Sequence, residues 1–204
     1  MASVVNPAFH HCQGHTLAEL GVELGRDPFD ILVDLVCEDN GRSTGVMHSL
    51  DPNDIESVFK SPLHVPCSDG MWTENGNPHP RHFGAFARVI KLFVRERGLL
   101  TLEEAVRKMT SLPAQRLGLM DTGLLRAGMR ADIAIFDPYI VEDRATFDQP
   151  RQLAEGFSHV IVNGKLVLED GELTGARPGR ALTAMGQATS NGGAACGCGC
   201  GCDR

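Results

Sequence analysis

The stretch Leu63-His64-Val65-Pro66-Cys67-Ser68-Asp69-Gly70 is the part of the chain from which the rest can be interpreted. A short apolar run that ends in a small residue, a carboxylate and a glycine predicts a buried strand that delivers Asp69 to a loop. In parallel α/β folds, the carboxyl ends of strands open onto the crevice or barrel mouth where chemistry takes place. Asp69 is therefore the first candidate for a catalytic residue.

The residues before this stretch carry three helix start signals. Thr16-Leu17-Ala18-Glu19 fits a capping box, in which the Thr and Glu side chains satisfy free backbone donors. Asp27-Pro28 and Asp51-Pro52 each combine an N-cap residue with a proline in the first helical turn. We expect helices to begin at all three sites.

Apolar periodicity adds a core face and a strand to this region. The helix after Asp27 is predicted to bury a stripe made of Phe29, Leu32, Val33 and Val36, and residues 45–48 could form a short strand. Helices alternating with strands are typical of a barrel or a doubly wound sheet.

After the loop that follows Asp69, the sequence predicts helices and then a small β module. An amphipathic helix is expected over residues 83–97, ending at Gly98, and a second capping box begins at Thr101. Residues 131–136 suit a strand, and Asn163-Gly164 predicts a type I′ hairpin turn. We therefore divide the chain into an α/β part (1–117), a β module (118–182) and a Gly-rich tail expected to be disordered (183–204).

Composition restricts the class of protein. With 204 residues, 42% apolar residues and 22% charged residues, the chain has the profile of a soluble globular protein. A net charge of −7 and the lack of a Lys/Arg block argue against a nucleic-acid or anionic-membrane partner. No apolar run approaches the roughly 20 residues of a membrane helix, and no signal peptide is visible. We expect a cytoplasmic protein.

The seven cysteines fall into two groups. Cys12, Cys37 and Cys67 have apolar neighbours and are predicted to be reduced and buried. Cys196, Cys198, Cys200 and Cys202 alternate with glycine, so they could wrap a soft ion such as Zn²⁺ or Cu⁺. The alternative, which we favour, is a low-complexity, oxidation-prone tail.

Several motifs together resemble one family, the N-acyl-D-amino-acid deacylases (D-aminoacylases) of the amidohydrolase superfamily. The matching segments are Cys67-Ser68-Asp69-Gly70, His79-Pro80-Arg81 with Gly84, Lys108-Met109-Thr110-Ser111-Leu112-Pro113-Ala114, Gly128-Met129-Arg130-Ala131-Asp132 and Val162-Asn163-Gly164. Their order and spacing fit from about residue 14 to residue 182.

The resemblance implies a fold, a cofactor and roles for two residues. The fold is the C-terminal part of a TIM-like (β/α)8 barrel followed by a small β-sandwich, and the cofactor is Zn²⁺. Asp69 matches the aspartate that acts as general base and acid beside a metal-activated water, and it is also a candidate metal ligand. Arg81 matches the arginine that binds the free carboxylate of the N-acyl amino acid substrate.

The chain departs from the family in lacking a His-x-His pair. His10, His11 and His15 have no zinc-motif spacing, and the resemblance gives them no role. We therefore expect the C-terminal portion of a deacylase, which would self-associate or pair with the missing half of the barrel.

Alternatives stay open for the two residues and for the protein. Asp69 could simply cap a loop, and Arg81 could be the solvated first turn of the next helix. The protein could be a dihydroorotase-like or hydantoinase-like cyclic amidohydrolase. It could also be a catalytically inactive truncated fragment, or a subunit that completes a barrel with another chain.

Overall fold

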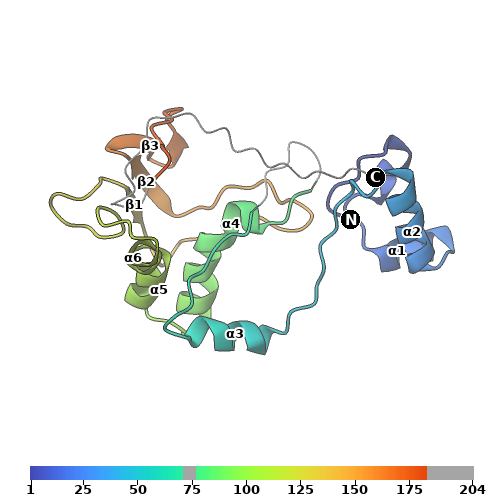
Figure 1. Cartoon of the computed structure of the whole chain (residues 1–204), viewed down its shortest axis with the longest axis horizontal. Helices are drawn as coiled ribbons and strands as arrows, with labels where there is room; N and C mark the ends of the chain where they lie inside the picture. Colours follow the sequence, from blue (N-terminus) through green and yellow to red (C-terminus); the bar gives the residue numbers. More distant parts are fainter. Residues whose placement is uncertain (71–76, 183–204) are drawn as a thin grey trace, which may run out of the picture.

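The computed structural model of the chain describes residues 1–70 and 77–182. Figure 1 shows α1 and α2 as a pair at one end, joined by an extended segment to α3 and the later elements. The helical elements are η1 (Pro7–Cys12), α1 (Leu17–Leu24), α2 (Pro28–Glu38), α3 (Pro52–Lys60), α4 (Arg81–Arg88), η2 (Val89–Glu96), α5 (Leu102–Met109) and α6 (Ser111–Arg116). The strands are β1 (Ile133–Phe136), β2 (Phe157–Val162), β3 (Lys165–Glu169) and β4 (Glu172–Leu173).

Side-chain caps confirm the predicted helix starts. Thr16 accepts a hydrogen bond from the Glu19 backbone N–H, and the Glu19 carboxylate accepts one from the Thr16 backbone, which completes the capping box of α1. Asp27 and Asp51 cap α2 and α3, each followed by proline, and Thr101 caps α5. These caps satisfy donors that have no partner inside the helix, so they define where each helix begins.

Helix α2 buries a different face from the predicted one. Ile31 and Leu35 lie in the core, whereas Phe29 is 68% exposed and Val36 is 50% exposed. The helix carries apolar residues on most of its sides, so the periodicity of its sequence alone cannot indicate which face is buried. Packing selects it, because Ile31 and Leu35 join Leu20 of α1 in one apolar cluster.

The strand predicted before Asp69 is not formed among the described residues, and neither is the one predicted at residues 45–48. Residues 65–67 are non-helical, and none of their backbone groups pairs with another described segment. A strand requires a hydrogen-bonded neighbour, and this segment has none in the described chain.

All three described cysteines are free, but only Cys12 is buried. The prediction that Cys37 and Cys67 are buried was wrong, because the apolar faces around them lack a covering element. The cysteine tail predicted from the sequence lies outside the described residues. Within residues 1–70 and 77–182, no helix combines the length and apolar character needed to cross a bilayer.

A continuous helical segment runs from α4 through η2, where the winding becomes π-helical. Val89, Ile90 and Phe93 are buried, as expected for an amphipathic helix, while Phe86 is 47% exposed. Gly98 ends the segment with a φ of 57°, the left-handed conformation typical of a helix-terminating glycine. The segment therefore presents one face to the core and leaves part of its apolar surface uncovered.

Lys108 on α5 is fully buried and holds the end of α3. Its Nζ donates to the backbone carbonyl of Phe59 at 2.7 Å and to that of Ser61. Burial lowers the pKa of Lys108, and the two carbonyls offset the cost of enclosing its amine. Both carbonyls lie at the carboxyl end of α3, where helical acceptors lack partners. Through this contact, α5 fixes the start of the segment that leads to Asp69.

The C-terminal strands form one antiparallel sheet in the order β1-β2-β3-β4. The predicted hairpin is confirmed, since Asn163 and Gly164 have φ angles of 50° and 76°, and Val162 pairs with Lys165 across them. The described residues thus form an α/β fold, and within them there is neither a closed barrel nor a second sheet layer.

We predict that Gly156→Ala destabilises the protein more than Gly171→Ala. Both glycines have positive φ angles, 87° and 83°, so alanine strains either backbone by about 1–2 kcal/mol. A Cβ at position 156 would also lie 2.6 Å from the Cα of Val141, whereas at position 171 it meets nothing within 4 Å. Urea unfolding should show a loss of about 1–2 kcal/mol for Gly171→Ala and about 2–5 kcal/mol for Gly156→Ala. Equal losses would contradict the packing of Val141 onto this glycine.

Candidate functional site

Asp69 and Arg81, the two residues singled out from the sequence, form an ion pair. Arg81 Nη2 lies 2.7 Å from Asp69 Oδ2. Both side chains are open to solvent, with 42% of Arg81 and 74% of Asp69 exposed. A pair this exposed contributes at most about 1 kcal/mol, so a competing charge can displace either partner.

Local backbone geometry places both side chains. Asp69 has a φ of 44°, a left-handed conformation that is uncommon for a residue with a side chain. The Gly70 N–H donates to Ser68 Oγ at 3.3 Å, which closes a turn around Asp69. Arg81 is the first residue of α4, directly after Pro80, so it stands at the amino end of that helix.

His79 lies beside this pair and accepts a hydrogen bond from it. The Arg81 backbone N–H donates to His79 Nδ1 at 3.1 Å, so the neutral ring carries its proton on Nε2. The ring also packs edge-on against Phe147, with 5.1 Å between the centroids. Burial, followed by the nearby charge of Arg81, lowers the pKa of His79 and favours this neutral form.

His82 packs against the turn that holds Asp69. Both of its ring nitrogens are enclosed, and neither has a hydrogen-bond partner in the described part of the chain. A Cβ added at Gly70 would lie 3.0 Å from the His82 ring. The glycine therefore allows the turn to approach the imidazole closely.

A cavity of about 410 Å³ opens next to Arg81. Its lining includes His79, Arg88, Asp143 and Phe147. Arg88 donates to Asp143 at 2.9 Å, and the Asp143 side chain is only 6% exposed. Of the two arginines at this cavity, Arg88 is held by a buried carboxylate and Arg81 by an exposed one. An anionic ligand can therefore bind Arg81 at a lower cost in free energy than it can bind Arg88.

A cluster of ion pairs anchors α4 and η2. Lys91 Nζ lies 2.5 Å from Glu142 Oε2 and 3.4 Å from Asp143 Oδ1. Arg95 lies 2.5 Å from Glu142 and donates to the Val141 carbonyl at 2.7 Å. The Lys91 hydrogen bond lowers the pKa of Glu142, and the same bond raises the pKa of Lys91. Together these contacts fix the helix against the segment that precedes β2.

A metal site is not built by the described residues. Residues 1–70 and 77–182 bring together no three His, Cys, Asp or Glu side chains that could hold an ion. The carboxylate of Asp69, a candidate ligand, contacts Arg81. Zinc therefore has no complete site made from these residues alone.

Three residues around the site were not recognisable from sequence patterns, namely Asp143, His82 and Phe147. Asp143 reaches α4 through packing between residues 55 positions apart, and no local pattern reveals such a contact. Gly84 is the one usable signal, because a glycine inside a helix often marks a close approach. A Cβ at Gly84 would lie 2.9 Å from the Cβ of Asp143.

Comparison with known proteins places the chain among amidohydrolases. The sequence profile of the amidohydrolase family matches residues 5–168. An N-acyl-D-aspartate deacylase of Alcaligenes xylosoxydans xylosoxydans is 41% identical over 165 residues, which make up 78% of this chain and 33% of that enzyme. A crystal structure of D-aminoacylase gives a TM-score of 0.75 at 34% identity, covering 85% of this chain and 35% of that one.

A second solved structure contains the expected metal. The N-acyl-D-glutamate deacylase of Bordetella bronchiseptica, in complex with zinc and a phosphonate mimic of the tetrahedral intermediate, gives a TM-score of 0.73 at 34% identity. It covers 83% of this chain, and this chain spans about a third of the length of these relatives. A dihydroorotase of Lactobacillus acidophilus is 32% identical over only 100 residues, or 43% of the chain. The longer and stronger similarity favours the deacylases over the cyclic amidohydrolases.

We predict that the protein loses stability as the pH falls from about 7.5 to about 5.5, and that His79 contributes to this loss. The pKa of His79 is lowered in the folded protein, so the unfolded chain takes up the proton first, near the ordinary value of about 6.5. The stabilisation is complete above that value and is lost as the pH falls through it. Urea unfolding at both pH values should show a smaller loss for His79→Asn, whose amide oxygen can accept the same hydrogen bond. An equal loss in the two proteins would contradict the lowered pKa.

Proposed function

The chain belongs to the amidohydrolase family, and we propose that it is the part of an N-acyl-D-amino-acid deacylase that supplies Asp69 and Arg81 to the active site. The reaction is hydrolysis of an N-acyl amide to a carboxylate and a free D-amino acid. Asp69 moves the proton, and Arg81 binds the free carboxylate of the substrate. The observation that carries the proposal is the exposed ion pair between these two side chains beside a cavity.

The ion pair links substrate binding to the release of Asp69. A substrate carboxylate offers Arg81 the same charge and shape as Asp69 does, and a guanidinium can bind such a group through two parallel hydrogen bonds. Because the Arg81–Asp69 pair is exposed, exchanging one carboxylate for the other costs little. Once the substrate occupies Arg81, Asp69 is free to turn toward the scissile amide.

Asp69 then carries a single proton through the reaction. It accepts the proton of the attacking water while the water oxygen bonds to the amide carbonyl carbon. It returns this proton to the amide nitrogen as the C–N bond breaks, and the D-amino acid leaves with a neutral amine. A positioned carboxylate of this kind accelerates such a step by about 10²–10⁴-fold.

Zinc belongs to the site of the Bordetella relative, but the described residues of this chain do not enclose an ion. We expect the ligands of such an ion to come from outside residues 1–70 and 77–182. In the proposed enzyme, this chain contributes Asp69 for proton transfer and Arg81 for carboxylate binding, and the contact between the two side chains supports that pairing of roles.

The two parts of the chain have separate places in the proposed enzyme. Residues 1–117 are the last βα units of a (β/α)8 barrel, in which the extended segment between α3 and α4 takes the place of a barrel strand. Residues 118–182 supply strands of a small β-sandwich, of which β1 to β4 form one layer. Asp69 then lies at the carboxyl end of a barrel strand, where catalytic residues of such barrels are found.

We predict that Arg81→Met weakens binding of N-acetyl-D-glutamate by about 10–100-fold. Hydrogen bonds between charged groups contribute about 1.5–3 kcal/mol, and the variant removes them while keeping an unbranched side chain. Titration calorimetry on the full chain measures this without requiring turnover. The α-carboxamide of the same ligand should bind the wild type and the variant equally weakly.

Arg116→Met is the matched control, because Arg116 is an exposed arginine at the end of α6. It should leave the affinity unchanged. The role of Arg81 is refuted if its replacement has no effect, or if the carboxamide and the carboxylate bind the wild type equally well.

A further inference from the structure

We propose that His82 is a positioning residue for Asp69, and that its imidazole receives the Asp69 carboxylate when a ligand carboxylate binds Arg81. The proposal rests on the proposed function for the identity of that ligand. It is supported by the unpaired imidazole of His82, by the packing of this ring against the turn that carries Asp69, and by the exposure of the ion pair that Asp69 would leave.

The His82 imidazole lacks the partners that an enclosed polar group normally has. Both ring nitrogens are shielded from solvent, and neither forms a hydrogen bond within residues 1–70 and 77–182. Enclosed donors and acceptors are nearly always paired in folded proteins, because an unpaired group loses its bond to water without replacement. A neutral imidazole carries one N–H, which can stand on either nitrogen. The ring therefore has an N–H available for an acceptor.

The ring lies against the turn that carries Asp69. A Cβ placed on Gly70 would lie 3.0 Å from His82 Cδ2 and 3.5 Å from His82 Nε2. Consecutive Cα atoms are about 3.8 Å apart, so the Nε2 edge of the ring faces a backbone position one residue away from Asp69. Ser68 Oγ in the same turn already accepts a hydrogen bond from the Gly70 N–H at 3.3 Å. The Asp69 carboxylate is charged, which makes it the stronger acceptor for the His82 N–H.

The groups that take part in this exchange gather around His79. Burial is the largest cause of the lowered pKa of His79, the charges of Arg81, His48 and His82 lower this pKa further, and the charge of Asp69 raises it. Arg81 and His82 are consecutive residues in the first turn of α4. The exchange therefore moves the Asp69 carboxylate between two neighbouring residues of one helix.

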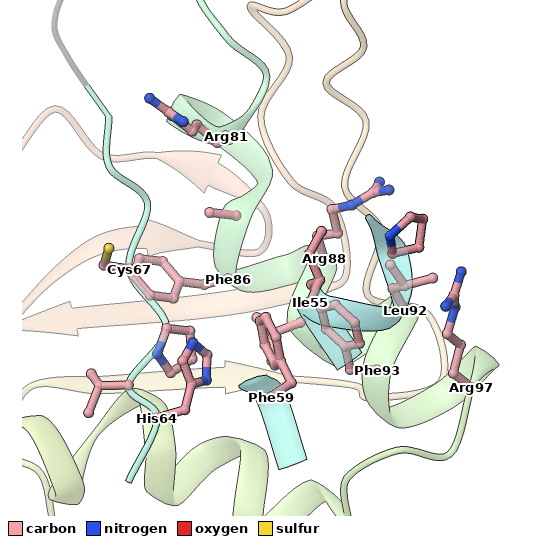
Figure 2. Close-up of a pocket in the computed structure, with 15 residues that line it drawn as sticks. Ile55, Phe59, His64, Cys67, Arg81, Phe86, Arg88, Leu92, Phe93 and Arg97 are labelled. Atoms are coloured by element: carbon pink, nitrogen blue, oxygen red, sulfur yellow. The ribbon is translucent and has the colours of Figure 1, made fainter. Parts of the chain in front are cut away.

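The present partner of Asp69 holds it weakly. The Asp69–Arg81 pair is exposed, so it biases the position of the carboxylate by at most about five-fold. Figure 2 shows Arg81 extending from the start of α4 on the side where the chain passes Cys67. Once a ligand occupies Arg81, a bond from His82 to one carboxylate oxygen of Asp69 leaves the second oxygen for the proton of the attacking water. His82 thus sets the direction of Asp69 at the stage when it acts.

The first experiment follows the His82 side chain by ¹⁵N-edited NMR on the full chain, with His82→Gln identifying its signals. Adding N-acetyl-D-glutamate to the wild type should shift the His82 Nε2–H resonance downfield, because that proton then bonds to a carboxylate. Asp69→Ala should abolish this response. Arg81→Met should produce the shifted signal without any ligand, since Asp69 has then lost its other partner.

Titration calorimetry with the same ligand measures the coupling between His82 and Asp69. His82→Leu should weaken binding by about two- to five-fold, a limit set by the exposed pair that Asp69 leaves. In the Asp69→Ala background the same substitution should have no effect, because the carboxylate that His82 receives is gone. His82→Gln keeps an N–H donor near the position of Nε2, so it should restore most of the affinity.

His64→Leu is the matched control. His64 also has an enclosed ring nitrogen without a hydrogen-bond partner among the described residues, but its ring packs on Phe59 of α3, with 4.4 Å between the centroids. It lines a second cavity, of about 520 Å³, together with Phe59 and Arg81 (Figure 2). Any change in affinity caused by His64→Leu should be the same with and without Asp69.

Two results would each overturn the proposal. One is a His82 signal that fails to respond to the bound ligand or to Arg81→Met. The other is an effect of His82→Leu that is absent, or that is equal with and without Asp69, as a purely structural role would give. If the wild type binds no N-acetyl-D-glutamate, or Arg81→Met binds it equally well, the proposed function fails instead. The spectrum of Arg81→Met without ligand then still decides whether His82 receives Asp69.

Discussion

The ion pairs that hold the α4–η2 helix against residues 138–143 are the constraint on which the site depends. Lys91, Arg95 and Arg88 on one side meet Glu142 and Asp143 on the other. These pairs are partly enclosed and share partners, so they resist displacement more than a single surface pair does. The same helix begins with Arg81, which forms an ion pair with Asp69, the candidate catalytic residue. These ion pairs therefore fix the helix along its length, while Arg81 at its start keeps a partner, Asp69, that a ligand can replace.

The Arg81–Asp69 pair stands at the amino end of α4, and Arg81 lines both of the cavities that adjoin this helix. Because the pair is exposed, exchanging one carboxylate partner of Arg81 for another costs little free energy. The Arg88–Asp143 pair at the same helix is more enclosed on its carboxylate side, since the Asp143 side chain is only 6% exposed. The two arginines therefore differ in how readily a ligand can displace their partners.

Local chemistry in the sequence was enough to predict the helix starts and the hairpin, whereas Arg81 was singled out by the resemblance to the deacylases, and the structure places it in contact with Asp69. Caps and turns depend on neighbouring residues, as at Thr16 and Asn163, so they can be recognised without tertiary information. The buried face of α2 and the strand before Asp69 depend on what packs or pairs with them, and periodicity does not contain that. The contact between Asp143 and α4 joins segments that are far apart in the sequence. Gly84 was the one indication of it in the sequence. The sequence therefore located the candidate site, but not the ion pairs and packing contacts that hold its elements in place.

In the proposed enzyme, Asp69 and the substrate carboxylate compete for Arg81. The most direct test is the affinity of the Asp69→Asn chain for N-acetyl-D-glutamate, measured by titration calorimetry beside Asp30→Asn, an exposed aspartate of α2. Removing a competitor that contributes about 0.2–1 kcal/mol should tighten binding by up to about five-fold. Asp30→Asn should leave the affinity unchanged. Weaker binding by Asp69→Asn, or equal effects of the two substitutions, would contradict the account.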